Sequence, residues 1–345
     1  MKTIVLEPTN RCNRSCQHCF RNKADPPGSL ALEVADSALS QAEALGFKVV
    51  CLTGGEVALY PHLGELLGLV AARGFHFTLV TNGYRFPDYV LPLLLEPQVK
   101  ERLLSVSFSL DGARAETHDG LRGPKSFREV IEGATLCRNH HLPFSLKTTI
   151  TTLNRGELTE LALLGARLGA TEHGFLHPFP TPNFIRCGLL LSPREMQDTV
   201  PWIKDNLMGV TSNRIKVEGH SMDGVLLDCG QLVDYINLDY QGNLILCCTL
   251  SHVTLGDGIP TSFGGELVAD LKEVSLKEAI VRKFYKAAEV MEAKINGGGN
   301  LQGLSETPCH WCLKYFGKFD WLKDFPDSPW TKWLMDGNSH RPNHS

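Results

Sequence analysis

The chain has 345 residues, 11 of them cysteine, and a formal net charge of -4 at neutral pH. Hydrophobic residues make up 43% of the sequence and charged residues 21%, which is typical of a globular protein whose core needs no disulfides. The slight negative charge gives no electrostatic basis for binding nucleic acid. The apolar runs are far shorter than a membrane span, and the N-terminus lacks the long apolar core of a secretory signal. We therefore expect a cytoplasmic protein with no membrane partner.

Strand-like and helical patterns alternate through the first half of the chain. Apolar runs predict six strands, at Thr3–Leu6, Val49–Thr53, His76–Thr81, Leu103–Leu110, Phe144–Ile150 and Thr171–Leu176. Helical patterns predict five helices between them, at Leu30–Leu45, His62–Ala72, Asp88–Leu95, Ser126–His140 and Arg155–Leu168, and a further helix at Pro193–Leu207. The alternation predicts an α/β fold with a partial (βα)6 TIM-like barrel, although an ordinary doubly wound sheet would give the same rhythm.

The run RCNRSCQHCF follows the first predicted strand and places Cys12, Cys16 and Cys19 on one short loop. Three thiolates at this spacing indicate a metal site, and soft sulfur ligands favour an iron–sulfur cluster or zinc. A cubane cluster has four irons, so three cysteines leave one iron open. A zinc knuckle without its fourth ligand and an unrelated redox loop are the alternatives.

Gly54-Gly55-Glu56 ends the second predicted strand. Paired glycines let the backbone approach a ligand closely, and a carboxylate can accept hydrogen bonds from an ammonium group. The same residues could simply form a turn.

Further polar side chains lie at or near the ends of the next strands. Asn82 follows the third strand, and Ser109 and Asp111 stand at the end of the fourth. Such groups can bind ribose hydroxyls or a carboxylate, or they can satisfy their own backbone in Asx turns. Lys147, within the fifth strand, could point into the barrel and pair with a carboxylate, or reach solvent at the strand edge.

A second set of cysteines lies in the C-terminal part of the chain. Cys229 and Cys247 flank a predicted hairpin, DYINLDYQGNLILC, and Cys309 and Cys312 form a CxxC motif. Four thiolates would close the coordination shell of a cubane cluster or of zinc. Cys248 competes with Cys247, which we favour because it ends a hairpin strand. Among the other cysteines, only Cys187 is kept as a candidate active-site residue.

The CxxxCxxC loop, the GGE motif and the run SLDGARAETHDGLRG resemble the radical S-adenosylmethionine (radical SAM) superfamily. The resemblance implies that Cys12, Cys16 and Cys19 hold a [4Fe-4S] cluster whose open iron is chelated by SAM. An electron from the reduced cluster, supplied by a flavodoxin- or ferredoxin-type protein, then splits SAM to a 5'-deoxyadenosyl radical. The resemblance also implies contacts with SAM, near the adenine and around the methionine moiety and ribose, from His18, Gly54, Gly55, Glu56, Asn82, Ser109, Asp111 and Lys147.

The C-terminal cysteines Cys229, Cys247, Cys309 and Cys312 resemble the twitch version of the SPASM domain, which holds one auxiliary [4Fe-4S] cluster. The implied organisation is a radical SAM core at 1–190, a bridging region at 191–225, a small cluster-binding domain of β-hairpin plus helix at 226–320, and an aromatic-rich tail at 321–345 that is disordered from 338. We expect no leader-binding domain before the barrel.

The resemblance implies an oxidoreductase that modifies a ribosomal peptide, with the auxiliary cluster as electron acceptor. A twitch-type dehydrogenase or carbon-skeleton-modifying enzyme that acts on a small hydroxylated metabolite is the alternative. A non-catalytic electron-transfer or metal-sensing protein would explain the cysteines but not the GGE and SLDG motifs.

Overall fold

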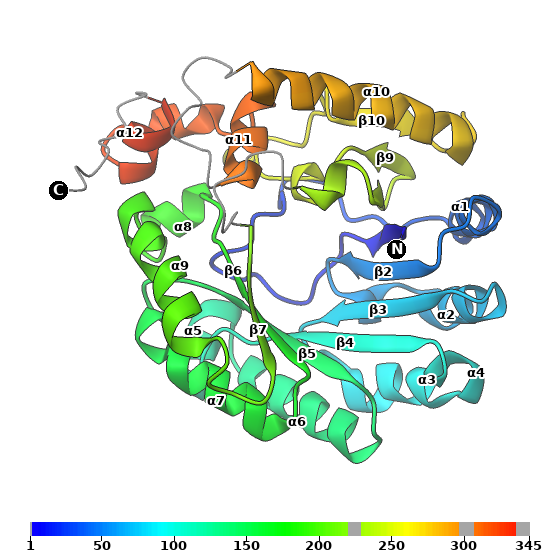
Figure 1. Ribbon diagram of the computed structural model, residues 1–345, viewed down its shortest axis with the longest axis horizontal. Helices are drawn as coiled ribbons and strands as arrows, with labels where there is room; N and C mark the ends of the chain where they lie inside the picture. Colours follow the sequence, from blue (N-terminus) through cyan, green and yellow to red (C-terminus); the bar gives the residue numbers. More distant parts are fainter. Residues whose placement is uncertain (1, 220–228, 297–306, 336–345) are drawn as a thin grey trace.

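A computed structural model describes residues 2–219, 229–296 and 307–335. Its strands form one ten-stranded sheet and are β1 (Thr3–Thr9), β2 (Val49–Gly54), β3 (His76–Thr81), β4 (Leu103–Ser109), β5 (Phe144–Thr149), β6 (Glu172–Leu176), β7 (Arg214–Glu218), β8 (Tyr235–Leu238), β9 (Asn243–Ile245) and β10 (Leu267–Asp270). Strands β1 to β7 follow one another in the sheet and pair in parallel. The predicted α/β architecture with a mostly parallel central sheet is confirmed, and the curvature of the sheet in Figure 1 is consistent with a partial barrel.

Helices cover the outer side of this sheet (Figure 1). The helices up to Leu207 are α1 (Leu32–Ala44), α2 (Leu63–Ala72), α3 (Leu91–Leu95), α4 (Pro97–Lys100), α5 (Ala115–Arg122), α6 (Ser126–Asn139), α7 (Leu158–Leu168), α8 (Pro182–Arg186) and α9 (Pro193–Leu207), of which α5 and α8 lie against the cysteine loop. The C-terminal helices are α10 (Leu276–Ile295), α11 (Pro308–Tyr315) and α12 (Pro329–Met335). Short helical turns are η1 (Val57–Leu59), η2 (Phe86–Val90), η3 (Arg155–Glu157), η4 (Gly230–Leu232), η5 (Cys248–Leu250) and η7 (Asp320–Asp324).

All six predicted strands are present, with ends shifted by a few residues at most. Their outward side chains form the core between sheet and helices; Phe108 on β4, for example, is fully buried and packs against Phe86 with ring centroids 4.9 Å apart. The predicted helix at Asp88–Leu95 is divided between η2 and α3, at a point where Pro87 and Pro92 interrupt the usual hydrogen bonds. Sequence analysis did not place α5, α10 or β7.

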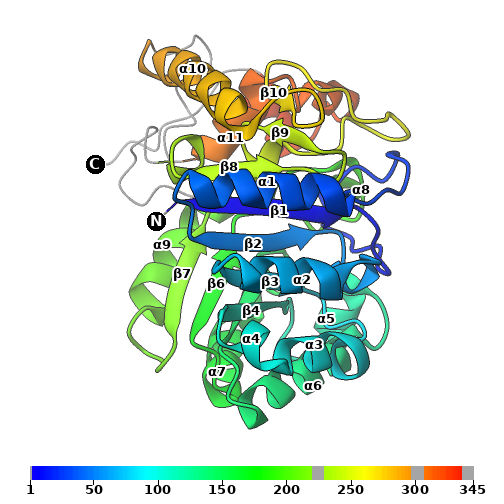
Figure 2. The same ribbon diagram turned by 90° about the vertical axis from the view of Figure 1, so that its right-hand side faces the viewer.

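The predicted hairpin is present as antiparallel β8 and β9, and it extends the central sheet. Strand β8 pairs in parallel with β1, from Thr3 opposite Tyr235 to Leu6 opposite Leu238. Figure 2 shows β8, β1 and β2 side by side, with α1 across them and α10 beyond. The predicted boundary at 225/226 and the predicted disorder of 338–345 lie outside the described residues.

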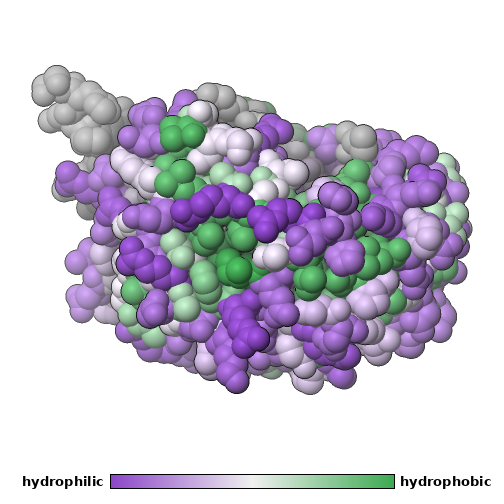
Figure 3. Space-filling model, turned by 90° about the horizontal axis from the view of Figure 1, so that it is seen from below, coloured by the Kyte–Doolittle hydropathy of each residue, from purple (hydrophilic) through white to green (hydrophobic). Residues whose placement is uncertain are grey.

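Hydrophobic patches alternate with hydrophilic bands on the face seen in Figure 3. Within residues 2–219, 229–296 and 307–335, no helix is long and apolar enough to cross a membrane.

Candidate functional site

The cysteine loop is held at the carboxyl end of the sheet by the two glycines that end β2. The backbone N–H of Gly55 donates to the Thr9 carbonyl at 2.9 Å, and that of Glu56 donates to the Arg11 carbonyl at 2.8 Å. A Cβ on Gly55 would lie 2.1 Å from the Arg11 oxygen, and one on Gly54, whose φ is +118°, would lie 2.6 Å from the Thr9 oxygen. Only glycines allow this approach, so the GGE motif positions the loop that carries the three cysteines.

The three cysteines of this loop are free thiols that lie close enough to influence one another electrostatically. Burial raises the pKa of Cys12 to about 11 and raises that of Cys16 as well. Two donors from other elements approach the sulfurs: Asn82 Nδ2 lies 3.7 Å from Cys12 Sγ, and Arg122 Nη1 lies 3.9 Å from Cys16 Sγ. A bound cation or cluster would supply the positive charge that stabilises the thiolates.

Asp111 is fully buried behind this loop and forms an ion pair with Arg122. Its other oxygen accepts from the Thr149 backbone N–H at 2.8 Å, and His18 Nε2 lies 3.2 Å from the oxygen shared with Arg122. Burial by itself would raise the pKa of Asp111, but the Arg122 guanidinium and the neighbouring histidines hold it below its ordinary value. Asp111 therefore orients Arg122 and His18; a direct contact between Asp111 and SAM stays a prediction.

His18 is buried and neutral, because burial lowers its pKa to about 4 in spite of the nearby Asp111. Its Nε2 atom lies 3.2 Å from the Asp111 carboxylate, which leaves Nδ1 for another partner. That Nδ1 atom is buried and has no hydrogen-bond partner among the described residues. The position of His18 near the adenine of SAM stays a prediction.

Glu56 is fully buried, and protein donors surround its carboxylate. It accepts from Thr81 Oγ1 at 2.8 Å, from the Asn82 backbone N–H at 2.7 Å and from the Ala58 N–H at 3.2 Å. Burial raises the pKa of Glu56 to about 7, against these hydrogen bonds. The side chain joins β2 to β3, and its contact with the amino group of SAM stays a prediction.

Ser109 and Lys147 lie opposite each other on β4 and β5. The Lys147 ammonium pairs with Glu218 on β7 and lies 3.6 Å from Glu172 on β6, whose other oxygen is 2.5 Å from Lys216. The expectation that Lys147 pairs with a carboxylate is confirmed, whereas contacts of Ser109 and Lys147 with SAM stay predictions.

The four C-terminal cysteines that sequence analysis selected meet around one enclosed cavity of about 20 Å³. Its lining consists of Cys229, Leu232, Leu246, Cys247, Thr249, Leu250, Pro308, Cys309 and Cys312. Soft thiols in an apolar shell match the donor chemistry of an iron–sulfur cluster or zinc. Loading a cubane would require the thiols to move apart, since the cavity has room for about one water molecule.

Cys248 does not line this cavity, and its thiol instead forms a hydrogen bond with Cys247. This bond lowers the pKa of Cys247 to about 6, while the pKa of Cys248 is raised well above its ordinary value. Cys247 therefore lines the cavity and Cys248 does not, and the choice of Cys247 as ligand stays a prediction. Cys187 is exposed at the end of α8, with its thiol 3.4 Å from the side-chain oxygen of Gln17 in the cysteine loop.

The segments that follow the two cysteine sets are joined to each other. The Asn22 backbone N–H donates to the His252 carbonyl at 2.6 Å, and His252 Nδ1 lies 2.7 Å from Asp25. The other ring nitrogen lies 3.0 Å from Asp239 in the hairpin turn. Burial would lower the pKa of His252, but the two carboxylates raise it above its ordinary value. His252 thus links the segment after the cysteine loop to the hairpin turn through two carboxylates.

Aromatic side chains connect the CxxC helix α11 to the barrel and to the C-terminal helix. His310, between Cys309 and Cys312, stacks on Trp330 with ring centroids 4.9 Å apart and lies 4.7 Å from His177 at the end of β6. Trp330 Nε1 donates to the Leu191 carbonyl at 2.6 Å. The aromatic tail therefore packs on both the cysteine helix and the segment that follows the barrel.

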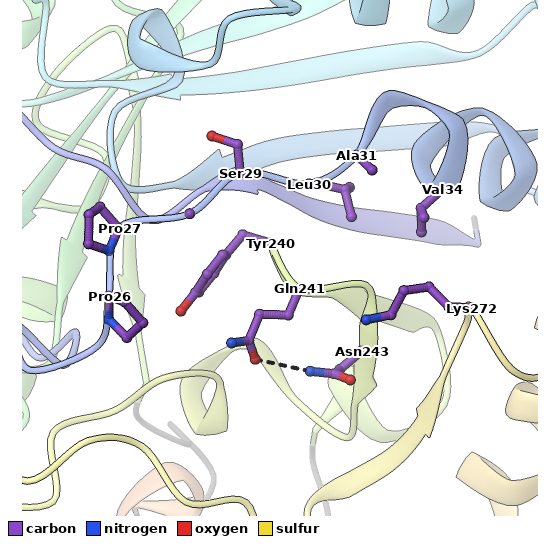
Figure 4. Close-up of a pocket in the computed structure, with 11 residues that line it drawn as sticks. Pro26, Pro27, Ser29, Leu30, Ala31, Val34, Tyr240, Gln241, Asn243 and Lys272 are labelled. Carbon is purple, nitrogen blue, oxygen red and sulfur yellow. Dashed lines mark hydrogen bonds between the residues drawn. The ribbon is translucent and has the colours of Figure 1, made fainter.

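A wide pocket of about 620 Å³ lies elsewhere, between the start of α1 and the β8–β9 turn. Figure 4 shows Pro26 and Pro27 on one side of Tyr240, and Val34 and Lys272 on the other. None of the predicted site residues lines it. In the described ranges, no three His, Cys, Asp or Glu side chains converge on a position for a single metal ion. A cubane cluster needs no such point, because each cysteine binds a different iron.

Sequence analysis missed Arg122, although it quoted the SLDGARAETHDGLRG run in which this residue stands. It also missed Lys283 and Lys294, two buried lysines of α10. Only their spacing along one helix could have indicated that both lysines lie on the same buried face. The sequence did not predict helix α10, so this spacing was not recognised.

Residues 6–164 match the family described as Radical SAM superfamily. The AdoMet-dependent heme synthase of Methanosarcina barkeri is 31% identical over 188 residues, which cover 52% of this chain and 51% of that protein. The mycofactocin maturase MftC of Mycobacterium ulcerans is 30% identical over 175 residues, which cover 49% and 45%. The chain thus spans about half the length of these curated relatives.

The likeness of fold extends over more of the chain. The structure of anSMEcpe with bound AdoMet and Kp18Cys peptide superposes with a TM-score of 0.62 at 16% identity, and the match covers 94% of this chain and 97% of that one. Residues 6–164 are thus similar to the radical SAM superfamily, and the fold of nearly the whole chain is similar to that of anSMEcpe.

Proposed function

We propose that this protein cleaves SAM reductively at a [4Fe-4S] cluster and oxidises a peptide substrate, with an auxiliary [4Fe-4S] cluster as electron acceptor. The observation that carries the proposal is the difference between the two cysteine sets. Three thiols stand on one loop at the open end of the sheet, and four line one enclosed cavity.

A cluster held by Cys12, Cys16 and Cys19 would, together with SAM, supply a 5'-deoxyadenosyl radical that can take a hydrogen atom from a substrate carbon. The substrate radical then loses one proton and one electron, so that the substrate is oxidised by two electrons in total. A cluster with four cysteine ligands would be a suitable acceptor for this electron, because it can change charge without binding a further ligand.

The residues around the N-terminal loop would hold and orient SAM. Gly54 and Gly55 fix the loop by close backbone contacts, and the buried Nδ1 of His18, which has no partner among the described residues, would be available for a hydrogen bond with the adenine. Arg122, held by Asp111, places positive charge beside Cys16.

A peptide substrate is supported by the relatives and the fold neighbours. MftC is named as a maturase, and the anSMEcpe structure contains a peptide. A small hydroxylated metabolite is the second candidate.

The decisive experiment is a comparison of cysteine variants after anaerobic reconstitution. The unsubstituted protein should contain about eight irons, and a variant that retains only one cluster should contain about four. Substitution of Cys12, Cys16 and Cys19 by Ala should abolish 5'-deoxyadenosine formation. Substitution of Cys229, Cys247, Cys309 and Cys312 by Ala should leave SAM cleavage intact and halve the iron. Cys137→Ala, in the buried face of α6, is the matched control.

Three results would contradict the proposal. A total of about four irons in the unsubstituted protein would remove the auxiliary cluster, and zinc in place of the missing iron would identify the alternative metal. No SAM cleavage with a strong reductant would remove the radical chemistry. Unchanged oxidation of a substrate after loss of the C-terminal cysteines would remove the electron-acceptor role.

A further inference from the structure

We propose that Lys283 and Lys294, two buried lysines of α10, raise the reduction potential of the auxiliary cluster and so make it a better electron acceptor. This inference rests on the proposed function, because it takes the four C-terminal cysteines as ligands of that cluster.

The two lysines belong to the face of α10 that is turned into the protein. Their relative exposures are 2% for Lys283 and 5% for Lys294, and the same face carries Ala279, Ala287 and Val290. The lysines are eleven positions apart, which is about three helical turns, so both project from one side of the helix. Lysine is almost never fully buried without a partner or a function, so two on one buried stripe call for a physical reason.

Lys283 is held against the turn that follows Cys229. Its ammonium donates to three backbone carbonyls of this turn, those of Gln231 at 2.8 Å, Leu232 at 2.9 Å and Tyr235 at 2.6 Å. Within the described residues it forms no ion pair with a carboxylate, so no anion of the protein in direct contact neutralises it. Burial lowers the pKa of Lys283 to about 8, which leaves most of the ammonium protonated at pH 7. Its charge acts on Cys229 and Cys247.

Lys294 lies at the other end of the cysteine set. It forms a hydrogen bond with the Cys312 thiol, and its ammonium is 5.3 Å from the ring centre of Trp311 within the CxxC motif. Its charge also acts on Cys229 and Cys309. The two lysines together therefore reach all four cysteines, from one rigid helix.

Positive charge at this place has a definite redox effect. Reduction of a cluster held by Cys229, Cys247, Cys309 and Cys312 would add one negative charge to a site where four thiolates would already lie in an apolar shell. Two fixed ammonium groups stabilise the reduced state more than the oxidised state, and low polarity strengthens the interaction. The reduction potential then rises, and transfer of an electron from a substrate radical becomes more favourable. Lysines that only supported the fold would give no such shift.

The test measures the potential directly and does not depend on turnover. In the Cys12→Ala/Cys16→Ala/Cys19→Ala background, the auxiliary cluster is the only one, and its midpoint potential can be followed by electron paramagnetic resonance during a redox titration. We expect Lys294→Gln and Lys283→Gln each to shift the midpoint to more negative values, and the double variant to shift it further. Lys283→Arg and Lys294→Arg should retain the original potential, and Lys277→Gln, on the exposed side of α10, is the control.

The outcomes separate the inference from the proposed function. Variants that keep about four irons but show an unchanged midpoint overturn the role of the lysines and leave the auxiliary cluster in place. A triple-alanine protein without iron overturns the auxiliary cluster and this inference with it. Lys283→Gln could fail to fold, because three backbone carbonyls would lose their donor. In that case the midpoint potential of Lys294→Gln tests the inference, since Lys294 does not hold the turn that follows Cys229.

Discussion

The pair formed by Asp111 and Arg122 should be strongly coupled in its contribution to stability. Asp111 is fully buried and the Arg122 side chain is 11% exposed, so each charge depends on the other for compensation. Removal of one member of such a buried pair costs about 3–5 kcal/mol, whereas replacement of both often costs much less. For 345 residues, an unfolding entropy of about 2.1 cal/mol/K per residue converts this loss into a fall in Tm of about 4–7 °C.

The measurement is a double-mutant cycle by anaerobic thermal and chemical denaturation of the metal-free protein. Asp111→Asn and Arg122→Met should each lower the free energy of unfolding by about 3–5 kcal/mol. The double variant should lower it by clearly less than the sum of the two single losses. Asp88→Asn, in an exposed pair with Arg85, is the control and should change stability by less than about 1 kcal/mol. Additive losses in the double variant would refute the reasoning, because independent residues cannot form a mutually compensating pair.

Three further predictions concern other parts of the molecule. Because the pKa of His252 is raised in the folded state, its contribution to stability should be complete below pH 6.5 and should disappear as the pH rises through the folded pKa. His252→Gln should flatten this part of the plot of unfolding free energy against pH. An unchanged plot would show that the ion pairs of His252 do not cause the pH dependence. Gly55→Ala should lower the iron content of the N-terminal site, because the new Cβ would clash with the Arg11 carbonyl. Gly68→Ala, at a position with free space, should leave the iron content unchanged. Equal iron contents in the two variants would contradict the steric argument. Trp330→Phe should lower the free energy of unfolding by about 1 kcal/mol, because the hydrogen bond of the indole is lost. An unchanged free energy of unfolding in a denaturant titration would contradict this prediction.

The parts of the fold that sequence analysis found are those with local signals. Apolar strand runs and the stop glycines Gly46, Gly74 and Gly169, all at positive φ, marked the βα units well. The cysteine spacings selected the four thiols that share a cavity.

Long-range contacts left no such pattern. The pairing of β8 with β1 joins residues more than 200 positions apart, and nothing in either strand specifies its partner. Arg122 stands in a polar helix, where a charged residue normally faces solvent, so its burial depends on Asp111 from another loop. Polar residues whose role is set by distant partners were therefore the ones missed.

The position of β1 in the sheet also decides how the polypeptide can be divided. All seven residues of β1 are buried, and the strand is hydrogen-bonded to β2 on one side and to β8 on the other. A truncation that removed β8 would turn this apolar strand into an unprotected edge, the kind of surface on which chains associate. We therefore expect residues 2–219, expressed without the hairpin, to aggregate, and we expect a protease cut between the two parts to leave both fragments associated until the sheet unfolds.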